Sequence, residues 1–128
     1  MKGFVPSSIK EAVDFLYATM TEEGSDVIRS TPPEANHMTG GMAMRNAWGL
    51  WGKDSQLKRD AIATYGIAHP DDISGLINAW LWARERGEEF DPVAHCQRYH
   101  EHWKACGTDS LSAGGYNSKD HAEAVGTP

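Results

Sequence analysis

An all-α fold, a compact bundle of four to five helices with a flexible C-terminal tail, is predicted by three features of the sequence. Apolar residues recur at intervals of three and four over several stretches, as on one face of a helix. These stretches mostly begin at a capping residue or a proline and end near a glycine. No stretch shows the alternation of apolar and polar residues that is typical of a strand.

The first predicted helix begins after Ser8. Ser8 and Glu11 form a capping-box pattern, in which each side chain satisfies a free backbone donor of the other residue. Residues 25–41 are less regular, and we expect only a short helical turn at residues 26–28, before two prolines. The apolar stripe of the first helix comprises Ile9, Ala12, Val13, Leu16 and Met20.

Three helices joined by turns are predicted in the middle of the chain. One begins near Gly41, because two consecutive glycines would destabilise a helix interior, and it runs to Trp51. A short helix capped by Ser55 is expected to end at Gly66 in a Schellman motif. The next helix begins at Pro70 and carries Ile73, Leu76, Ile77, Trp80 and Leu81 on its apolar face. The apolar face of the helix ending at Trp51 carries Met44, Ala47, Trp48 and Trp51.

The last predicted helix begins at Asp91-Pro92 and ends at Gly107, with Val93, Cys96, His100 and Trp103 in its apolar stripe. From Thr108 onward the sequence is small, polar and without periodicity. We therefore expect residues 1–107 to form a single helical domain and residues 108–128 to form a flexible polar tail.

Charge argues against a nucleic-acid partner. The 128 residues include 12 basic and 18 acidic side chains, which gives a formal net charge of −6. Phosphate binding depends on clustered Lys and Arg, whereas a protein with a basic surface suits this charge better. The sequence contains no signal peptide and no apolar run long enough to span a membrane, so we expect a soluble cytoplasmic protein that makes no membrane contact.

The two cysteines, Cys96 and Cys106, are expected to be reduced thiols. Within one helix they would lie roughly 15 Å apart, too far for a disulfide. The same helix carries other residue types that ligate metals, but a straight helix offers only an i,i+4 pair to one ion. We therefore predict no metal and no other cofactor, although a pair such as His102 and Cys106 leaves the question open. The residues concerned are His95, Cys96, His100, His102 and Cys106.

Two segments carry a resemblance to a known family. They are Arg45-Asn46-Ala47-Trp48-Gly49-Leu50-Trp51 and Gly66-Ile67-Ala68-His69-Pro70-Asp71-Asp72-Ile73-Ser74. The chain resembles, over roughly residues 8–87, a small helical domain of unknown function found in bacterial and phage-encoded proteins. That family pairs an RN-x-WGLW segment with a G-I-x-HPDD-x-S segment. The resemblance implies no activity, but it implies that six residues of the two segments lie together: Arg45, Asn46, Trp48, His69, Asp71 and Asp72.

The segment His69-Pro70-Asp71-Asp72 has two interpretations. A histidine beside two carboxylates could act as a general base or bind a metal. Alternatively, the proline and both aspartates begin a helix while His69 caps it or packs against it. We favour the second interpretation, because adjacent aspartates in a first turn point in different directions.

Arg45 and Asn46 also allow a structural and a functional interpretation. The guanidinium of Arg45 could bind Asp71 or Asp72 and so tie two helices together, while Asn46 satisfies loop carbonyls. The alternative is an anion site lined by Arg45. Structural ion pairs are the commoner explanation for such a group of residues.

Trp82 lies on the opposite side of its predicted helix from Ile73, with Arg86 beside it. A helix with large apolar groups on both faces is either packed between other helices or exposes an interaction surface. We favour a central helix that is contacted on both sides. On an exposed surface, Trp82 and Arg86 would make a plausible interface anchor.

Two functions remain open at this stage. The first is a non-enzymatic interaction or regulatory module, encoded by a phage or mobile element and acting on a host protein. The second is a small hydrolase or ligand-binding protein, metal-dependent or not, with His69, Asp71, Asp72 and Arg45 in one pocket. We favour the first, leave a homo-oligomer open and predict no catalytic residue. The candidate binding residues are Trp82, Arg86, Arg45, Asn46, His69, Asp71 and Asp72.

Overall fold

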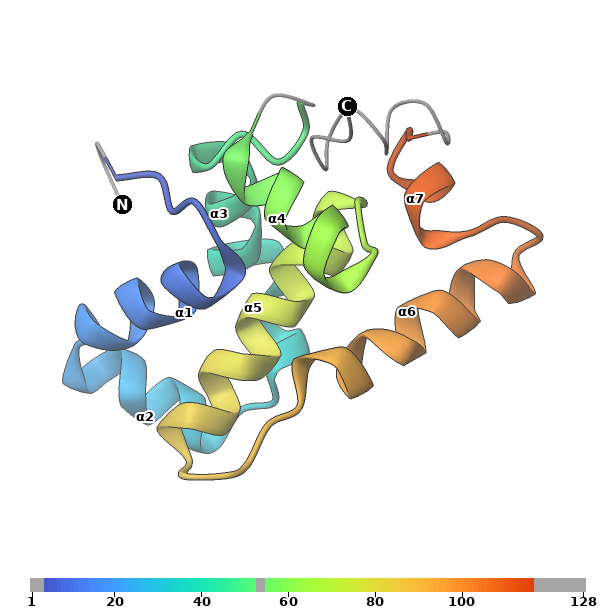
Figure 1. Cartoon of the computed structure of the whole chain (residues 1–128). Coiled ribbons are helices and arrows are strands. Elements are labelled where there is room, and N and C mark those ends of the chain that lie inside the picture. Colours follow the sequence, from blue (N-terminus) through green and yellow to red (C-terminus); the bar gives the residue numbers. More distant parts are fainter. Residues whose placement is uncertain (1–3, 53–54, 117–128) are drawn as a thin grey trace.

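All secondary structure in the described residues, 4–52 and 55–116 of a computed structural model, is helical (Figure 1). The all-α prediction is confirmed, although the chain forms more and shorter helices than the four to five expected. None of the helices in these residues is long and apolar enough to span a bilayer. In chain order they are α1 (Ile9–Ala18), α2 (Glu22–Ser30), the 3-10 helix η1 (Pro33–Asn36), the π-helix η2 (His37–Gly41), α3 (Met42–Ala47), α4 (Gln56–Tyr65), α5 (Pro70–Glu85), α6 (Pro92–Ala105) and α7 (Ser110–Ala113).

Helix α5 is the centre of the structure. It contacts α1, α2, α3, α6, η1 and η2, and Figure 1 shows it passing between α1 and α2 on one side and α6 on the other. Residues on most of its circumference are buried, including both Ile73 and Trp82. The prediction of a central helix contacted on both sides is therefore confirmed.

The main core forms where α1 and α5 meet the chain around α3 and α4. Helix α1 contributes Ile9 and Val13, which are almost completely buried, as its predicted stripe requires. Burial of such side chains is the dominant favourable term in folding. The cluster comprises Ile9, Ala12, Val13, Met44, Trp48, Leu50, Leu57, Ala61, Ile67, Ile73, Leu76, Ile77 and Cys96.

Helix α4 ends at Gly66 as predicted, but in the single-bond αL cap rather than in a Schellman motif. Gly66 has a φ of 67°, and its N–H donates to the Ile62 carbonyl at 3.1 Å. The N–H of Ile67 donates to the Ala61 carbonyl at 3.4 Å, and the Ile67 side chain is fully buried. A Schellman motif would instead pair Gly66 with Ala63 and Ile67 with Ile62, so the glycine stop and the packing of Ile67 are confirmed while the type of cap is corrected.

The capping box of α1 differs from the prediction by one residue. The Ser8 hydroxyl accepts from the Glu11 N–H at 3.0 Å, as expected. The Glu11 carboxylate, however, accepts from the N–H of Ser7 at 3.0 Å rather than from that of Ser8.

Residues 22–30 form a complete helix, α2, instead of the short turn expected at residues 26–28. Thr21 caps it by accepting from the Gly24 N–H at 3.1 Å, and two glutamates lie in its first turn. Ile28 alone among its residues is buried, and it packs against Leu81 and Trp82 of α5. With a single buried apolar residue, the helix has no stripe for periodicity to reveal.

The helix predicted to reach Trp51 ends at Ala47, and the prediction that Trp51 is buried is wrong. Gly49 adopts a φ of 65° and turns the chain. The next side chain, Leu50, consequently points into the core, while Trp51 is 61% exposed. Ala47 also lies on the surface.

Two predictions for the C-terminal part need correction. Val93 is 64% exposed rather than part of the core, whereas Cys96 is buried. The segment expected to form the tail contains α7, and Tyr116, which is 3% exposed, packs with Ile62 and Ala68. Asp109 caps α7 by accepting from a backbone N–H, so packed structure continues beyond Gly107. Residues 117–128 of the predicted tail lie outside the described residues.

Candidate ligand-binding pocket

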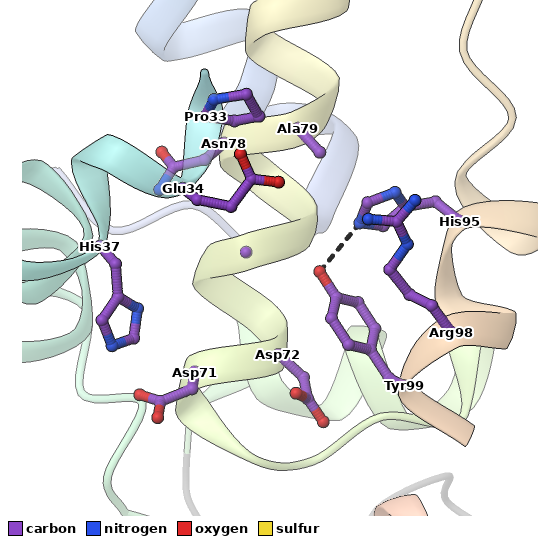
Figure 2. A pocket seen from close by; sticks show the side chains of 11 residues that line it. Pro33, Glu34, His37, Asp71, Asp72, Asn78, Ala79, His95, Arg98 and Tyr99 are labelled. Carbon is purple, nitrogen blue, oxygen red and sulfur yellow. Dashed lines mark hydrogen bonds between the residues drawn. The ribbon is translucent and has the colours of Figure 1, made fainter. Parts of the chain in front are cut away.

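A cavity of about 300 Å³ lies between η1, η2, α5 and α6 (Figure 2). Figure 2 shows His37 and Glu34 on the side of η1 and η2, and His95, Arg98 and Tyr99 on the side of α6. The carboxylates from the first turn of α5 lie at one end. The lining residues are Pro33, Glu34, His37, Asp71, Asp72, Gly75, Asn78, Ala79, His95, Arg98 and Tyr99.

The start of α5 places both aspartates at this pocket. Pro70 occupies the first helical position, and Nδ1 of His69 accepts from the Asp71 N–H at 3.0 Å. Both carboxylates lie at the positive end of the helix dipole. The helix-start interpretation of this segment is therefore confirmed, including the capping role of His69.

Asp72 is the most buried charged group of the lining, at 7% exposure. Its Oδ2 accepts from Trp103 Nε1–H at 2.8 Å. No hydrogen bond reaches its Oδ1 among the described residues, and this oxygen is not one of the fully buried unpaired atoms, so it is open to the solvent of the cavity. Burial raises the pKa of this carboxyl, although the Trp103 hydrogen bond and the nearby His69 act in the opposite direction. Asp72 therefore retains an unused acceptor in a site of limited solvation.

Asp71 is held by Arg45, whose Nε lies 3.5 Å from Asp71 Oδ1. The contact is electrostatic, because Nε makes no hydrogen bond of acceptable geometry. The other nitrogens of this buried guanidinium donate to Ser74 Oγ at 2.7 Å and to the His37 carbonyl at 3.0 Å. Arg45 thus links α5 to η2, two of the elements that line the pocket, although it is not itself a lining residue. The predicted tie is confirmed for Asp71, while Asp72 binds Trp103 instead.

The α6 wall contains a neutral pair and one cation. His95 Nε2 and the Tyr99 hydroxyl lie 2.9 Å apart in a hydrogen bond. Burial lowers the pKa of His95, and the charge of Arg98 lowers it further, so the imidazole is neutral near pH 7. Burial also raises the pKa of Tyr99, which stays protonated. Gly75 gives the tyrosine room, since a Cβ there would lie 2.7 Å from its hydroxyl oxygen.

The four residues that the hydrolase hypothesis places in one pocket do not converge. Asp71 and Asp72 line the cavity, whereas His69 and Arg45 do not. Nδ1 of His69 is used in the cap, and its ring stacks on Trp103 with centroids 5.5 Å apart.

Asn46 lies away from this pocket. It is exposed, and its Oδ1 accepts from the indole N–H of Trp51 at 3.1 Å. The expectation that the six residues named for the resemblance lie together is therefore wrong for Asn46.

Trp82 and Arg86 bind α2 to α5. Trp82 is 5% exposed, and its Nε1–H donates to the Thr31 carbonyl at 2.9 Å. Nη2 of Arg86 donates to the carbonyls of Ile28 at 2.7 Å and Thr31 at 2.6 Å. The idea of an exposed Trp82 anchor is wrong, because α2 covers the indole. Both side chains satisfy carbonyls at the C-terminal end of that helix.

Metal-ligating side chains do not cluster: the described residues contain no group of three or more that could hold an ion. His102 Nε2 and Cys106 Sγ lie 3.9 Å apart on exposed α6. Both cysteines are free thiols, and burial raises the pKa of Cys96 to about 12.

Most of the pocket lining escaped sequence analysis. Glu34 and His37 lie on a 3-10 and a π-helix, where no regular period predicts which side chains point inward. The sequence indicates His95 only as a candidate metal ligand and assigns no role to Tyr99. A residue pair at i,i+4 on α6 was the available signal for their hydrogen bond.

Fold and pocket define an all-α domain with a ligand-sized cavity against its central helix. The chain belongs to a family described as a domain of unknown function (DUF6794), which matches residues 5–85. The expectation of an unknown-function domain family is confirmed. The match includes η1 and α5 but ends before α6, so the family region covers only part of the pocket wall. Neither curated proteins nor solved structures give a significant match.

Proposed function

We propose that this protein is a non-enzymatic binding module whose pocket accepts a small organic molecule with an ammonium group. The observation that carries the proposal is the carboxylate of Asp72, which lines the cavity, is 7% exposed and has one oxygen without a partner. A buried carboxylate is costly unless opposite charge or hydrogen-bond donors compensate it. An ammonium group supplies a positive charge and three donors.

The remaining lining supports this ligand class. Glu34 and Asp71 add two further carboxylates, and the Arg45 guanidinium offsets only the second of them. Tyr99 offers an aromatic surface to alkyl or cationic groups. Arg98 is exposed and could bind a carboxylate at the far end of a zwitterionic ligand. The volume of about 300 Å³ is at the lower end of the range for small-molecule sites.

An anion site at Arg45 has less support. The guanidinium is 3% exposed, and it already donates to Ser74 and to the His37 carbonyl. An incoming anion would also meet the carboxylate of Asp71. We therefore favour a cationic ligand.

The protein-interaction function expected from sequence loses Trp82 as its anchor. A cytoplasmic location, an origin on a phage or mobile element and a host protein as target stay predictions. They are supported by small size, acidity and two free thiols.

The proposal is tested by NMR titration with four-carbon probes that differ in their terminal groups and hence in charge. We expect putrescine and 4-aminobutyrate to shift the resonances of α5 and α6, and butyrate and butanol to leave them unchanged. Asp72→Asn should weaken amine binding by at least about tenfold, because it removes the charge and keeps an acceptor for Trp103. Asp26→Asn is the matched control, since Asp26 is an exposed carboxylate outside the pocket.

Equal shifts with butyrate and the amines would rule out selection by charge. Unchanged amine affinity in Asp72→Asn would show that this carboxylate is not the binding group.

A further inference from the structure

Charged side chains lie at two opposite ends of the pocket. Asp71 and Asp72 lie at the start of α5, and Figure 2 shows Glu34 of η1 toward the other end, on the side of Asn78. The side-chain amide of Asn36 donates to Asn78 Oδ1 at 3.1 Å and so holds η1 against α5 at that level. Asn78 follows Asp72 by six residues of the helix, which corresponds to about 9 Å along its axis. The pocket therefore suits an extended ligand that carries charge at both ends.

The end beside Asn78 presents both signs of charge. Arg98 of α6 lines the same cavity as Glu34, and both side chains are exposed. Burial has the largest effect on the pKa of His95, but the charge of Arg98 also lowers this pKa and that of Glu34 raises it, so both charges act on the same imidazole. Among the described residues, neither Glu34 nor Arg98 takes part in an ion pair. One anion and one cation can therefore bind a ligand at this exposed end.

The end at the start of α5 is more buried and carries only negative charge. Asp72 is 7% exposed, and its Oδ1 is open to the cavity while Oδ2 accepts from Trp103. The guanidinium of Arg45 offsets the charge of Asp71 but does not contact Asp72. One carboxylate at this end therefore lacks a counter-ion.

Between these ends, the α5 and α6 walls are uncharged. Gly75 contributes no side chain, and the hydroxyl of Tyr99 is already bound to His95 at 2.9 Å. Burial raises the pKa of Tyr99, and the charge of Asp72 raises it further, so the phenol is neutral. Methylene groups can pack along this wall without leaving a polar group unpaired.

We propose that the pocket binds a free basic α-amino acid of the length of lysine, an inference that rests on the proposed binding of an ammonium group at Asp72. The side-chain ammonium binds Asp72, and the methylene groups lie along Gly75 and Tyr99. The α-ammonium and the α-carboxylate bind Glu34 and Arg98. Each charged group of the ligand thus meets the opposite charge, and the doubly charged head group stays at the exposed end, where it loses little hydration.

Length and charge both favour lysine over simpler amines. The five bonds from Cα to Nζ of lysine extend about 6 Å, and a hydrogen bond adds about 3 Å, which agrees with the separation of the two ends. A diamine has no carboxylate for Arg98. An amino acid with a single, terminal amine has no second ammonium for Glu34.

Four probes that differ by one charged group test each contact on the full-length protein. L-Lysine carries all three groups, cadaverine lacks the α-carboxylate, 6-aminohexanoate lacks the α-ammonium, and L-norleucine lacks the side-chain ammonium. Isothermal titration calorimetry should find lysine the tightest. Norleucine should bind at least about tenfold more weakly, because it leaves the buried Asp72 unpaired. Cadaverine and 6-aminohexanoate should bind about two- to fivefold more weakly, because water screens the exposed Glu34 and Arg98.

Two substitutions connect each ligand group with its residue. Arg98→Gln should abolish the preference for lysine over cadaverine and keep the preference over 6-aminohexanoate, and Glu34→Gln should do the reverse. Both side chains are exposed, so we expect both variants to fold. Arg59→Gln and Glu23→Gln are the matched controls, since these exposed residues do not line the pocket, and they should keep both preferences.

Equal affinities for lysine, cadaverine and 6-aminohexanoate would overturn the assignment to basic amino acids, while binding of these amines would leave the proposed function intact. Preferences that persist in both Arg98→Gln and Glu34→Gln would also overturn it, because other groups would then select the ligand. If no amine binds, putrescine included, the proposed function fails together with this inference.

Discussion

At Asp72, burial and hydrogen bonding act on one carboxyl group in opposite directions. Burial raises its pKa, the Trp103 hydrogen bond lowers it, and burial has the larger effect. The folded-state pKa is thus above that of the unfolded chain. Such a group destabilises the fold when it is ionised, and this cost is removed as pH falls through the folded-state pKa.

We therefore predict that Asp72→Asn stabilises the ligand-free protein at pH 7, raising Tm by about 2–5 °C. The amide oxygen can still accept from Trp103, while the charge is lost. The difference between the variant and the natural protein should become smaller as pH is lowered, because the natural carboxyl group then becomes neutral. Thermal unfolding followed by circular dichroism between pH 7 and pH 4 measures this effect.

A lower Tm for Asp72→Asn at pH 7 would contradict the prediction. An increase in Tm together with loss of amine binding would separate two roles of the same charge. The carboxylate would then reduce stability but supply the ligand contact, as is common at binding sites.

Among the helices, the contact between α2 and α5 distinguishes the two sequence-based interpretations of Trp82. A buried indole with a satisfied N–H should be required for stability rather than for binding. We predict that Trp82→Ala destabilises the protein by about 3–5 kcal/mol. Urea unfolding at low protein concentration measures this change in the free energy of unfolding.

Trp51→Ala is the matched control, because it removes the same side chain from a position that is 61% exposed. It should change stability by no more than about 0.5 kcal/mol. If the two substitutions cost the same, the assignment of Trp82 to the core and Trp51 to the surface would be wrong.

The same two tryptophans show how far sequence predicts structure in this chain. Helices α1 and α5 were predictable because their buried residues recur at helical spacing. The sequence predicts Trp51 to be buried, because it continues the apolar stripe of a regular helix. In the structure, the positive φ of Gly49 (65°) ends the helical spacing, so that Leu50 points into the core and Trp51 points to solvent. Glycine marks such a turn in sequence but does not specify its angle.

The candidate site was predictable only in part for a related reason. Asp71 and Asp72 are recognisable in the sequence because a proline and a histidine cap mark the start of α5. Their neighbours across the cavity come from η1 and α6, which are distant in sequence. A pocket between such elements depends on how the helices pack, and periodicity within a single helix does not contain that information.

For the molecule as a whole, the segment from Ser110 to Tyr116, which includes α7, packs over the loop that precedes α5. Tyr116 packs with Ile62 and Ala68, and His100 Nδ1 lies 2.6 Å from the hydroxyl oxygen of Ser110. Ala68 precedes His69, the cap of α5. The segment thus supports the loop from which the pocket carboxylates begin.

Gly114 makes this closure sterically possible. A Cβ at this position would lie 2.4 Å from the Ala68 carbonyl carbon and 2.5 Å from its Cβ, and the nearer of these atoms is backbone, so it cannot move aside cheaply. We predict that Gly114→Val costs about 1–3 kcal/mol of stability. It should also increase hydrogen exchange at Ile62 and Ala68, because the segment can no longer pack there. Ser112→Val, at an exposed position of α7, should leave exchange at those two amides unchanged. Equal exchange in both variants would mean that α7 and Tyr116 do not protect this part of the core, and that the folded domain ends near Gly107 after all.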